Sequence, residues 1–462
     1  MGHDLEGKVL VFLRTSSIAR IPMYEHLRDV CKAILVMVHP VRKPDFDGLF
    51  HLWIEEDTND VEKLEKAIKE ALAAKNLVAD AVCTYDEYGV FPAAHLSIKM
   101  GNRPMPFSPE KICMTNIKSD FRAECKRIGL SSPKSVALRQ SMYADKNFDP
   151  IAYLHAEGLS LPVVAKPSPG AGSLLARLCS SDDELREHLL TTWDVINTAP
   201  DVKHLLMLGT DVHVIVEEFI RGQEVDVDCV VENGKVVFAA VSDNFDVHPP
   251  YFVEVGGLSP SALKTEEHAA VLSLLDDFVS AYGNEVHAVL HFEAKYDFDR
   301  KAAYVIEVNC RMGSAETHTM LSTVYGANLG ECVPRLALGI PCTNVTSLPS
   351  VCKKTSALPR LKDAPIPEDG VVAFPVLIPN GFCASVNLYP SKVGKLSKAE
   401  VPDHPHKVVH SIASPIGALV APPPTMFYML CWIVARGDTA DEAIKHIKEQ
   451  SASFIHEVED EA

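Results

Sequence analysis

Two glutamates and an asparagine close to residue 300 have a spacing that a β-hairpin would bring together. The segments 288–296 and 303–308 are apolar and strand-like, and a polar turn separates them. If the hairpin is centred on position 300, Glu293 lies opposite Glu307, and opposed residues share one face of a sheet. Asn309 projects from the same face because it follows Glu307 by two positions. Opposed carboxylates repel unless a cation lies between them, and these oxygen ligands suit Mg²⁺, with Mn²⁺ as the alternative ion.

This arrangement predicts a site for a metal and a nucleotide on that face of the sheet. The other interpretation is a solvated polar face. The largely apolar run Tyr304-Val-Ile-Glu-Val-Asn309 disfavours it, because a solvated face would expose apolar side chains to water. A slip of one residue in the register would turn the whole set to the opposite face.

A lysine at the end of a second strand-like segment precedes a run of small residues. Lys166 closes the apolar segment 161–166, and Pro167-Ser-Pro-Gly-Ala-Gly-Ser173 follows it. An ammonium group beside free backbone N–H groups is a combination that cradles phosphates. The run lacks the Gly-Lys-Ser or Gly-Lys-Thr of a Walker motif, and most runs of this composition are plain turns. Phosphate binding and a simple turn are therefore both open.

A third segment, Val214-Ile-Val-Glu-Glu-Phe-Ile-Arg-Gly-Gln-Glu224, is an apolar strand that ends in two carboxylates, Glu217 and Glu218. One interpretation of this segment is an adenosine pocket, in which backbone groups near Phe219 and Ile220 would meet the edge of the adenine ring. Glu224 would then accept hydrogen bonds from the ribose hydroxyls. The alternative is an ordinary strand with a charged end.

The three segments, in this order, resemble the ATP-grasp superfamily of carboxylate–amine ligases over about residues 1–345. The resemblance adds Lys118, in Asn116-Ile-Lys-Ser-Asp120, as a phosphate-binding lysine, and Arg311 as the catalytic residue that stabilises transferred charge. Many relatives have Asn-Pro-Arg where this chain has Cys310 in the middle, a departure that leaves the spacing intact. The metal ligands implied are Glu293, Glu307 and Asn309. The ATP-binding residues implied are Lys118, Lys166, Ser168, Gly170, Gly172, Ser173, Glu217, Glu218, Phe219, Ile220 and Glu224.

Within the superfamily, residues 251–261 are similar to the substrate-side loop of L-amino acid ligases and carnosine-synthase-like dipeptide synthetases. This similarity implies a ligase that joins a small carboxylate, an amino acid, to an amine through an acyl phosphate, with release of ADP and phosphate. Glu254 and Glu316 are equal candidates for taking the proton of the amine. Two alternatives stay open: a related enzyme acting on bicarbonate or a purine precursor, and a non-catalytic ATP-binding regulatory module.

The elements that must position these residues begin with a strand, helix, strand alternation over the first 110 residues, typical of a doubly wound α/β unit. Ligands of such units bind at the carboxyl ends of the strands, which here include Tyr85-Asp86-Glu87 and make Glu87 a candidate substrate residue. Farther along, Asn233-Gly234 predicts a hairpin turn between two strands. Residues 343–370 read as an irregular linker. The Thr439-Ala-Asp-Glu442 capping box predicts a helix to about residue 458.

We therefore predict an α/β protein with an α+β lid, in an ATP-grasp fold. Its parts are an N-terminal doubly wound domain at 1–115, an ATP-grasp region at 116–345 with the lid at about 134–220, and a C-terminal closing domain at 346–462.

Composition excludes several other classes of protein. The 462 residues contain 44 Lys and Arg against 62 Asp and Glu, a net charge of −18, and no basic run, so we expect no nucleic-acid partner. The 12 cysteines form no CxxC pair and have no histidines at zinc spacing. With no export or membrane signal in the sequence, we expect a cytoplasmic protein without a membrane partner. The oligomeric state is open between a monomer and a homodimer.

Overall fold

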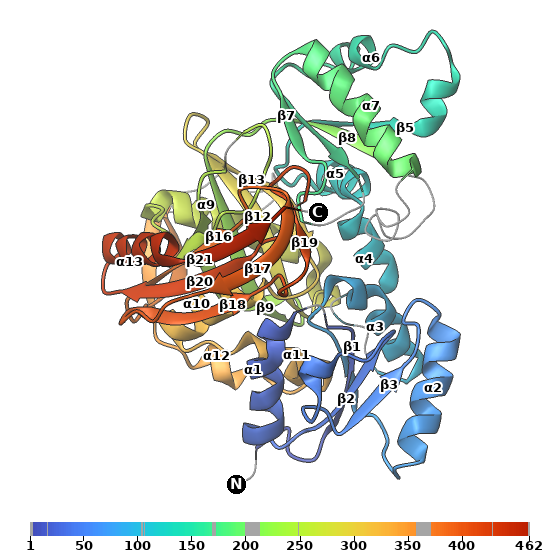
Figure 1. The fold of residues 1–462 in the computed structure, drawn as a ribbon, viewed down its shortest axis with the longest axis vertical. Helices are drawn as coiled ribbons and strands as arrows, with labels where there is room; N and C mark the ends of the chain where they lie inside the picture. Colours follow the sequence, from blue (N-terminus) through green and yellow to red (C-terminus); the bar gives the residue numbers. More distant parts are fainter. Residues whose placement is uncertain are drawn as a thin grey trace.

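The structure is a computed structural model, and its strands form five sheets in the part of the chain that it describes (Figure 1). The described residues are 3–15, 17–102, 105, 107–168, 172–198, 213–247, 249–356, 371–426 and 428–460.

The N-terminal unit is a small parallel sheet with helices packed on it. Its strands are β1 (Val9–Leu13), β2 (Ile34–His39), β3 (Leu52–Glu55) and β4 (Ala81–Cys83), in the order β3-β2-β1-β4. Its helices are α1 (Ile21–Glu25), α2 (Val61–Ala73) and α3 (Glu87–Lys99). The side chain of Asp60 caps α2, which buries Leu64, Ile68 and Leu72 at four-residue spacing. The predicted alternation of strands and helices is confirmed.

The lid is an antiparallel sheet that stands apart from the N-terminal unit, at the top of Figure 1. Its strands are β5 (Ser135–Arg139), β6 (Val163–Pro167), β7 (Arg177–Cys179) and β8 (His213–Glu218), in the order β5-β8-β6-β7. Its helices are α6 (Pro150–Ala156) and α7 (Asp182–Thr198). Its hydrophobic core consists of lid residues alone, between Leu138 and Val216. A unit with its own core can move as one body relative to the rest.

The central sheet has eight strands and supplies the floor of the site. In spatial order they are β13 (Ala302–Asn309), β12 (Ala288–Asp297), β9 (Gln223–Glu232), β10 (Lys235–Asn244), β11 (Gly257–Ser259), β16 (Phe382–Leu388), β20 (Cys431–Gly437) and β18 (Lys407–Ile412). One face packs on α9 (Thr265–Tyr282) through apolar residues such as Val225, Val227 and Phe292. Because side chains alternate along a strand, the residues between them point to the opposite face.

The register of the β12–β13 hairpin is the one predicted. Glu293 pairs with Glu307, and His291 pairs with Asn309. An irregularity follows Glu293, so that Ala294 pairs with Val305. The opposed glutamates lie on the side of this irregularity that keeps the predicted register.

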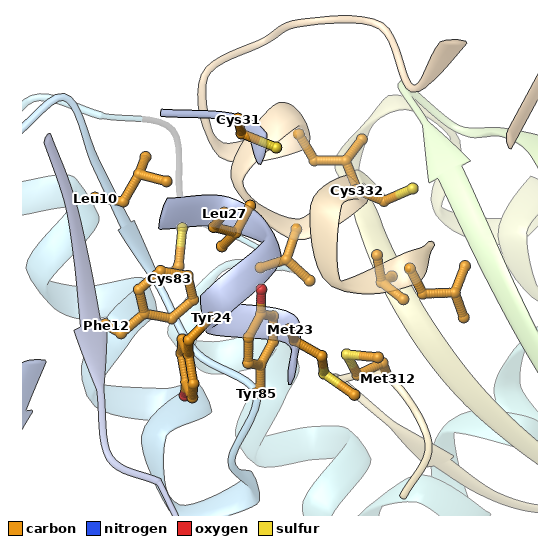
Figure 2. Packing of buried hydrophobic residues seen from close by; sticks show 14 of the residues in the cluster. Leu10, Phe12, Met23, Tyr24, Leu27, Cys31, Cys83, Tyr85, Met312 and Cys332 are labelled. Atoms are coloured by element: carbon orange, nitrogen blue, oxygen red, sulfur yellow. The ribbon is translucent and has the colours of Figure 1, made fainter. Parts of the chain in front are cut away.

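The N-terminal unit and the central sheet share a hydrophobic core. Phe12, Tyr24 and Tyr85 of the N-terminal unit belong to one buried cluster with Met312 and Cys332 (Figure 2), the latter on α11 (Leu329–Ala337). The hydroxyl of Tyr85 also donates a hydrogen bond of 2.6 Å to the backbone oxygen of Gly330 in α11. These two units therefore form one platform, unlike the separately packed lid.

Two predictions about the C-terminal part were wrong. Residues 343–370 are not simply a linker, because they contain α12 (Thr343–Thr346) and β14 (Ser350–Ser356), which pairs with β15 (Val371–Leu377); residues 357–370 lie outside the described part. The side chains of β14 are mostly exposed, so it has no apolar periodicity to detect. The last helix, α13 (Ala440–Ser453), ends early and gives way to β21 (Ile455–Glu459), an exposed strand paired with β17 (Gly394–Glu400). The two-residue strand β19 (Leu419–Val420) completes that sheet.

The helical segment before the lid is interrupted. Its two halves are α4 (Pro109–Asn116) and α5 (Lys118–Ile128), with Ile117 in an extended conformation between them. The break frees the backbone N–H of Lys118 for a hydrogen bond of 3.0 Å to the backbone oxygen of Ser168. Among the described residues, no helix combines the length and the apolar character needed to cross a membrane.

Candidate active site

A row of polar residues crosses four neighbouring strands of the central sheet. Glu307 on β13 pairs with Glu293 on β12, Glu293 pairs with Asp226 on β9, and Asp226 pairs with Ser242 on β10. Directly opposed residues share a face, and this face is the one turned away from α9. Three adjacent carboxylates therefore line one surface of the sheet.

Two of the predicted metal ligands, Glu293 and Glu307, lie in this row, and the third, Asn309, lies beside it, opposite His291. The Asn309 amide donates a hydrogen bond of 2.8 Å to Glu293. Burial and the negative charge of Glu307 raise the pKa of Glu293 to about 8. Burial opposes ionisation of Glu307 as well, but the charges of Lys118 and Lys166 outweigh it and lower the pKa of Glu307. Without a further cation the two carboxylates are thus not both ionised near neutral pH, and a divalent cation between them would favour the ionised form of each.

Both predicted phosphate-binding lysines reach this surface from other elements. Lys118 Nζ, at the start of α5, lies 3.3 Å from Glu307 Oε1. Lys166 Nζ, on lid strand β6, lies 2.7 Å from Glu217 Oε2 on β8. Arg122 Nε of α5 contacts the other Glu217 oxygen at 2.6 Å. Against the effect of burial, Arg122 and Lys166 lower the pKa of Glu217 to about 2, so this carboxylate stays ionised and fixes both cations.

A pocket opens between the lid and the sheet face. Of the predicted ATP-binding residues, those that line it are Lys118, Lys166, Gly172, Ser173, Glu217, Glu218, Phe219, Ile220 and Glu224. Ser168 does not line it, because its side chain is fully buried and its hydroxyl accepts a hydrogen bond of 2.9 Å from the backbone N–H of Ser119. Gly170 lies outside the described residues. Ser168 therefore joins the lid to the start of α5.

The outer part of this pocket is apolar with a charged edge. Phe219 and Phe252 lie with ring centroids 6.4 Å apart, and the ammonium of Lys295 lies 5.3 Å from the Phe219 ring. Lys295 Nζ also contacts Glu224 at 3.2 Å. The carboxylate of Glu218 forms an ion pair with Arg300. A flat apolar ring can pack against these side chains, next to a carboxylate that can accept hydrogen bonds from hydroxyl groups.

Arg311 is held by the N-terminal unit. Its Nε donates a hydrogen bond of 2.8 Å to Glu87, at the start of α3. Burial raises the pKa of Glu87, and the charge of Arg311 opposes this rise. The following loop is fixed at Gly313, whose N–H donates to Asp228 at 2.7 Å and whose oxygen accepts from Arg20 at 2.6 Å. Glu87 thus lies behind Arg311 and positions it.

A second pocket continues from the first beyond the metal ligands. It contains Glu254, from the loop between β10 and β11, and Glu316, from the first turn of α10 (Ala315–Tyr325). Arg311 and Glu293 line it as well. The side chain of Glu254 is open to the pocket, but the pocket walls shield it from bulk water. This shielding, followed by the negative charges of Glu316 and Asp226, raises the pKa of Glu254 to about 7. This pocket can hold the molecule that receives a phosphoryl group and the one that attacks it.

Three residues of the site were not predicted from the sequence. They are Asp226 on β9, and His291 and Lys295 on β12. Burial alone would lower the pKa of His291, but Asp228 and Asp226 raise it to about 10. The signal was present as alternation, since Glu224, Asp226 and Asp228 occupy every second position of an otherwise apolar strand.

The chain is similar to known proteins in sequence and in fold. Residues 159–319 match a family model described as an ATP-grasp domain. Carnosine synthase 1 from Gallus gallus is 26% identical over 344 residues, which are 73% of this chain and 36% of the relative. The chain thus spans little more than a third of the length of the curated relatives that it matches.

Two solved structures are similar over nearly the whole chain. L-amino acid ligase from Bacillus licheniformis has a TM-score of 0.77 at 17% identity, covering 98% of this chain and 100% of that one. Phosphoribosylglycinamide synthetase from Anaerococcus prevotii has a TM-score of 0.66 at 15% identity, with the same coverage. Residues 159–319 therefore form an ATP-grasp domain, and the chain has the ATP-grasp fold.

Proposed function

We propose that this protein is an ATP-dependent ligase that joins the carboxylate of an amino acid to an amine through an acyl phosphate, releasing ADP and phosphate. The observation that carries the proposal is the meeting of three elements at one point. The carboxylates Glu293 and Glu307 lie on the sheet, Lys118 reaches Glu307 from α5, and Lys166 comes from the lid. Oxygen ligands beside two ammonium groups suit a magnesium-bound triphosphate.

The residues present fit a divalent cation. Glu293 and Glu307 are opposed, and the charge of Glu307 disfavours ionisation of Glu293, a cost that a cation between them would remove. Asn309 adds a third oxygen ligand once its amide is turned. When bound there, Mg²⁺ would neutralise phosphate charge during transfer. Lys118 would lie at the same phosphates, since it already contacts Glu307.

Activation of the carboxylate depends on charge that the protein holds in place. Lys118 and Lys166 would neutralise the β- and γ-phosphates while the substrate carboxylate attacks in line. Arg311, held by Glu87 at 2.8 Å, would stabilise the acyl phosphate and then the tetrahedral oxyanion formed by the amine. Closure of the lid would exclude water, which otherwise hydrolyses the acyl phosphate.

The amine must lose a proton to attack, and Glu254 suits this step better than Glu316. A general base works best when its pKa lies near the working pH. The pKa of Glu254 is about 7, and its side chain is exposed within the pocket, where a substrate can reach it. We assign proton transfer to Glu254.

Similarity to an L-amino acid ligase in fold and to carnosine synthase 1 in sequence supports amino acids as the substrates. The test is chromatography of the nucleotides after incubation of the protein with ATP, Mg²⁺ and pairs of amino acids, with mass detection of products. We expect ADP and phosphate in equal amounts with an amide product. AMP as the main product would refute the proposal.

A control incubation without the amine sharpens this test. With the carboxylate alone, release of phosphate should be slow, because the acyl phosphate is protected until an amine arrives. Rapid release of ADP in the absence of every amine would indicate an ATPase rather than a ligase.

A further inference from the structure

The second pocket carries an excess of carboxylates. Besides Arg311 and His291, the charged residues that line it are Glu224, Asp226, Asp243, Glu254, Glu293 and Glu316. A pocket with this composition attracts cations, and the question is which of its carboxylates already have a partner in the protein.

Four of the six are already engaged. Glu224 contacts Lys295 at 3.2 Å, and Glu293 accepts a hydrogen bond from Asn309. Asp226 accepts a hydrogen bond of 2.9 Å from Asn244. Asp243 accepts one of 2.7 Å from the backbone N–H of Ala262, and the Ser261 hydroxyl also donates to it.

Glu254 and Glu316 differ from these four. Among the described residues, neither carboxylate has an ion pair or a hydrogen bond. Arg20 lies near enough to feel the charge of Glu316, but its guanidinium donates to the backbone oxygen of Gly313 at 2.6 Å. Glu316 is only 8% exposed, so water compensates its charge poorly.

Two more buried acceptors line the same pocket without a partner. Within the described part of the chain, the hydroxyl oxygen of Ser242 and the amide oxygen of Asn387, on β16, have no hydrogen-bond partner. Both residues are more than nine-tenths buried. The Asn387 amide nitrogen already donates to the backbone oxygen of Glu254 at 3.3 Å, which leaves its oxygen as the free atom. Buried acceptors without donors are costly, and a ligand that brings N–H groups would satisfy them.

The packing of α10 places one of these acceptors near Glu316. Asn387 lies on β16, the strand that α10 packs against, and Glu316 is in the first turn of α10. Ser242 lies farther away, because the register aligns its neighbour Asp243 with Leu258 and Ala384, three residues before Asn387. The acceptors that one ligand nitrogen can share are therefore Glu316 and Asn387.

We propose, resting on the ligase function above, that the amine substrate carries a second cationic nitrogen, as in a diamine or a diamino acid. Glu254 receives the proton of the attacking nitrogen. Glu316, with Asn387, binds the second nitrogen as an ammonium group. No bond to that second nitrogen is made or broken.

The expected preference follows from the strength of hydrogen bonds to charged groups. These bonds contribute about 1.5–3 kcal/mol each, so one ammonium bound by Glu316 should raise kcat/KM by about 10- to 100-fold. The gain should appear only for the charged member of a pair of amines with equal length.

The experiment compares such pairs in the intact protein with ATP, Mg²⁺ and a set of amino acids as carboxylate donors. L-lysine is compared with L-norleucine, and 1,5-diaminopentane is compared with pentylamine. The members of the second pair lack a carboxylate, so they can act only as the amine substrate. The measurement is kcat/KM for each amine, from ADP release and mass detection of the amide. We expect the dicationic member to be preferred by at least about tenfold.

Variants locate the effect in the pocket. Glu316→Gln should reduce kcat/KM for the dicationic amines by about tenfold or more while leaving the monoamines within about twofold. Glu70→Gln, an exposed change of the same type on α2, should alter neither. If the monoamines react as well as their partners, or if the preference survives Glu316→Gln, the inference is overturned while the ligase function is retained. Absence of an amide product with every amine would instead overturn the ligase function itself.

Discussion

The phosphate end and the amine end of the site differ in how the protein compensates its own charges. At the phosphate end, Lys118 contacts Glu307, and Lys166 contacts Glu217. At the amine end, Glu254 and Glu316 face the pocket without an ion pair from the described residues. The first end is held in place by its own charges before any ligand binds, whereas the second has charges that only a ligand can satisfy.

The two ends also differ in where their residues come from. The phosphate end is built on regular elements, namely α5, lid strands β6 and β8, and the hairpin β12–β13. The amine end is built from a loop, the first turn of α10 and strand β16. Regular elements hold catalytic groups in fixed positions, whereas loops vary more readily and suit the recognition of a particular substrate.

The largest effect should follow from Glu307→Gln at the phosphate end. The substitution keeps the size of the side chain but removes one charge from the proposed metal ligands and from the partner of Lys118. We expect kcat to fall by about 10³-fold or more, as when an electrostatic contact to the transition state is lost. Steady-state ADP release measures it, and an unchanged thermal unfolding midpoint serves as the control for the fold. Near-normal turnover would show that the carboxylate row binds no metal in catalysis.

A smaller effect should follow from Glu254→Gln at the amine end. Loss of a general base costs about 10²- to 10⁴-fold in rate, and we expect the lower part of this range because bulk water can accept protons in an open pocket. The pKa of Glu254 lies near 7, above its ordinary value, so the carboxylate is protonated at pH 6 and ionised at pH 8. In the parent protein, kcat/KM for the amine should therefore rise with pH through about 7.

The variant offers a direct check of that profile. In Glu254→Gln the rise near pH 7 should disappear, leaving only the titration of the amine itself. Because the fold raises the pKa of this carboxyl, ionising it costs stability as the pH rises from its ordinary value through the folded one. At pH 8 the variant should unfold at a temperature no lower than that of the parent. A rise near pH 7 that persists in the variant would assign the base to another group.

The same contrast explains what the sequence could predict. The pairing of Glu293 with Glu307 was predictable, because strand alternation and a local turn fix the register of a hairpin within about twenty residues. The meeting of Glu316 with Asn387 was not, because 71 positions separate them, and only the packing of α10 against β16 brings them to one pocket. Local periodicity carries information about elements, not about which loops meet.

Errors in the fold have the same physical origin. The segment of β14 was predicted to be part of a linker, because its side chains are mostly exposed and give no apolar pattern. The last helix was predicted to extend over β21, because a capping box marks only the start of a helix. Ser168 was predicted at the phosphates from composition, yet its hydroxyl binds the backbone of Ser119. Turn-rich runs are ambiguous until the partner of each polar group is known.

The smallest effect of the three should follow from Lys166→Ala. This variant tests how far the pairing of Lys166 with Glu217 reduces the contribution of the lysine to ATP binding. Lys166 is already partly neutralised by Glu217 at 2.7 Å, and Lys118 remains available to the phosphates. We therefore expect the KM for ATP to rise by about tenfold, well below the loss for Glu307→Gln. Lys69→Ala on α2, where the lysine pairs with Glu65 in an exposed setting, should change neither nucleotide kinetics nor stability.

Removing Lys166 also leaves Glu217, which is only 3% exposed, with Arg122 as its one remaining cation from the described residues. The lid should therefore lose stability as well as affinity. Adding Glu217→Gln to Lys166→Ala separates the two effects. The double variant should recover part of the lost unfolding temperature while its KM for ATP stays high, because the lost phosphate contact is not restored. Recovery of both the unfolding temperature and the KM for ATP would mean that Lys166 acts only by neutralising Glu217. Equal nucleotide kinetics in Lys166→Ala and Lys69→Ala would mean that Lys166 does not contact the phosphates.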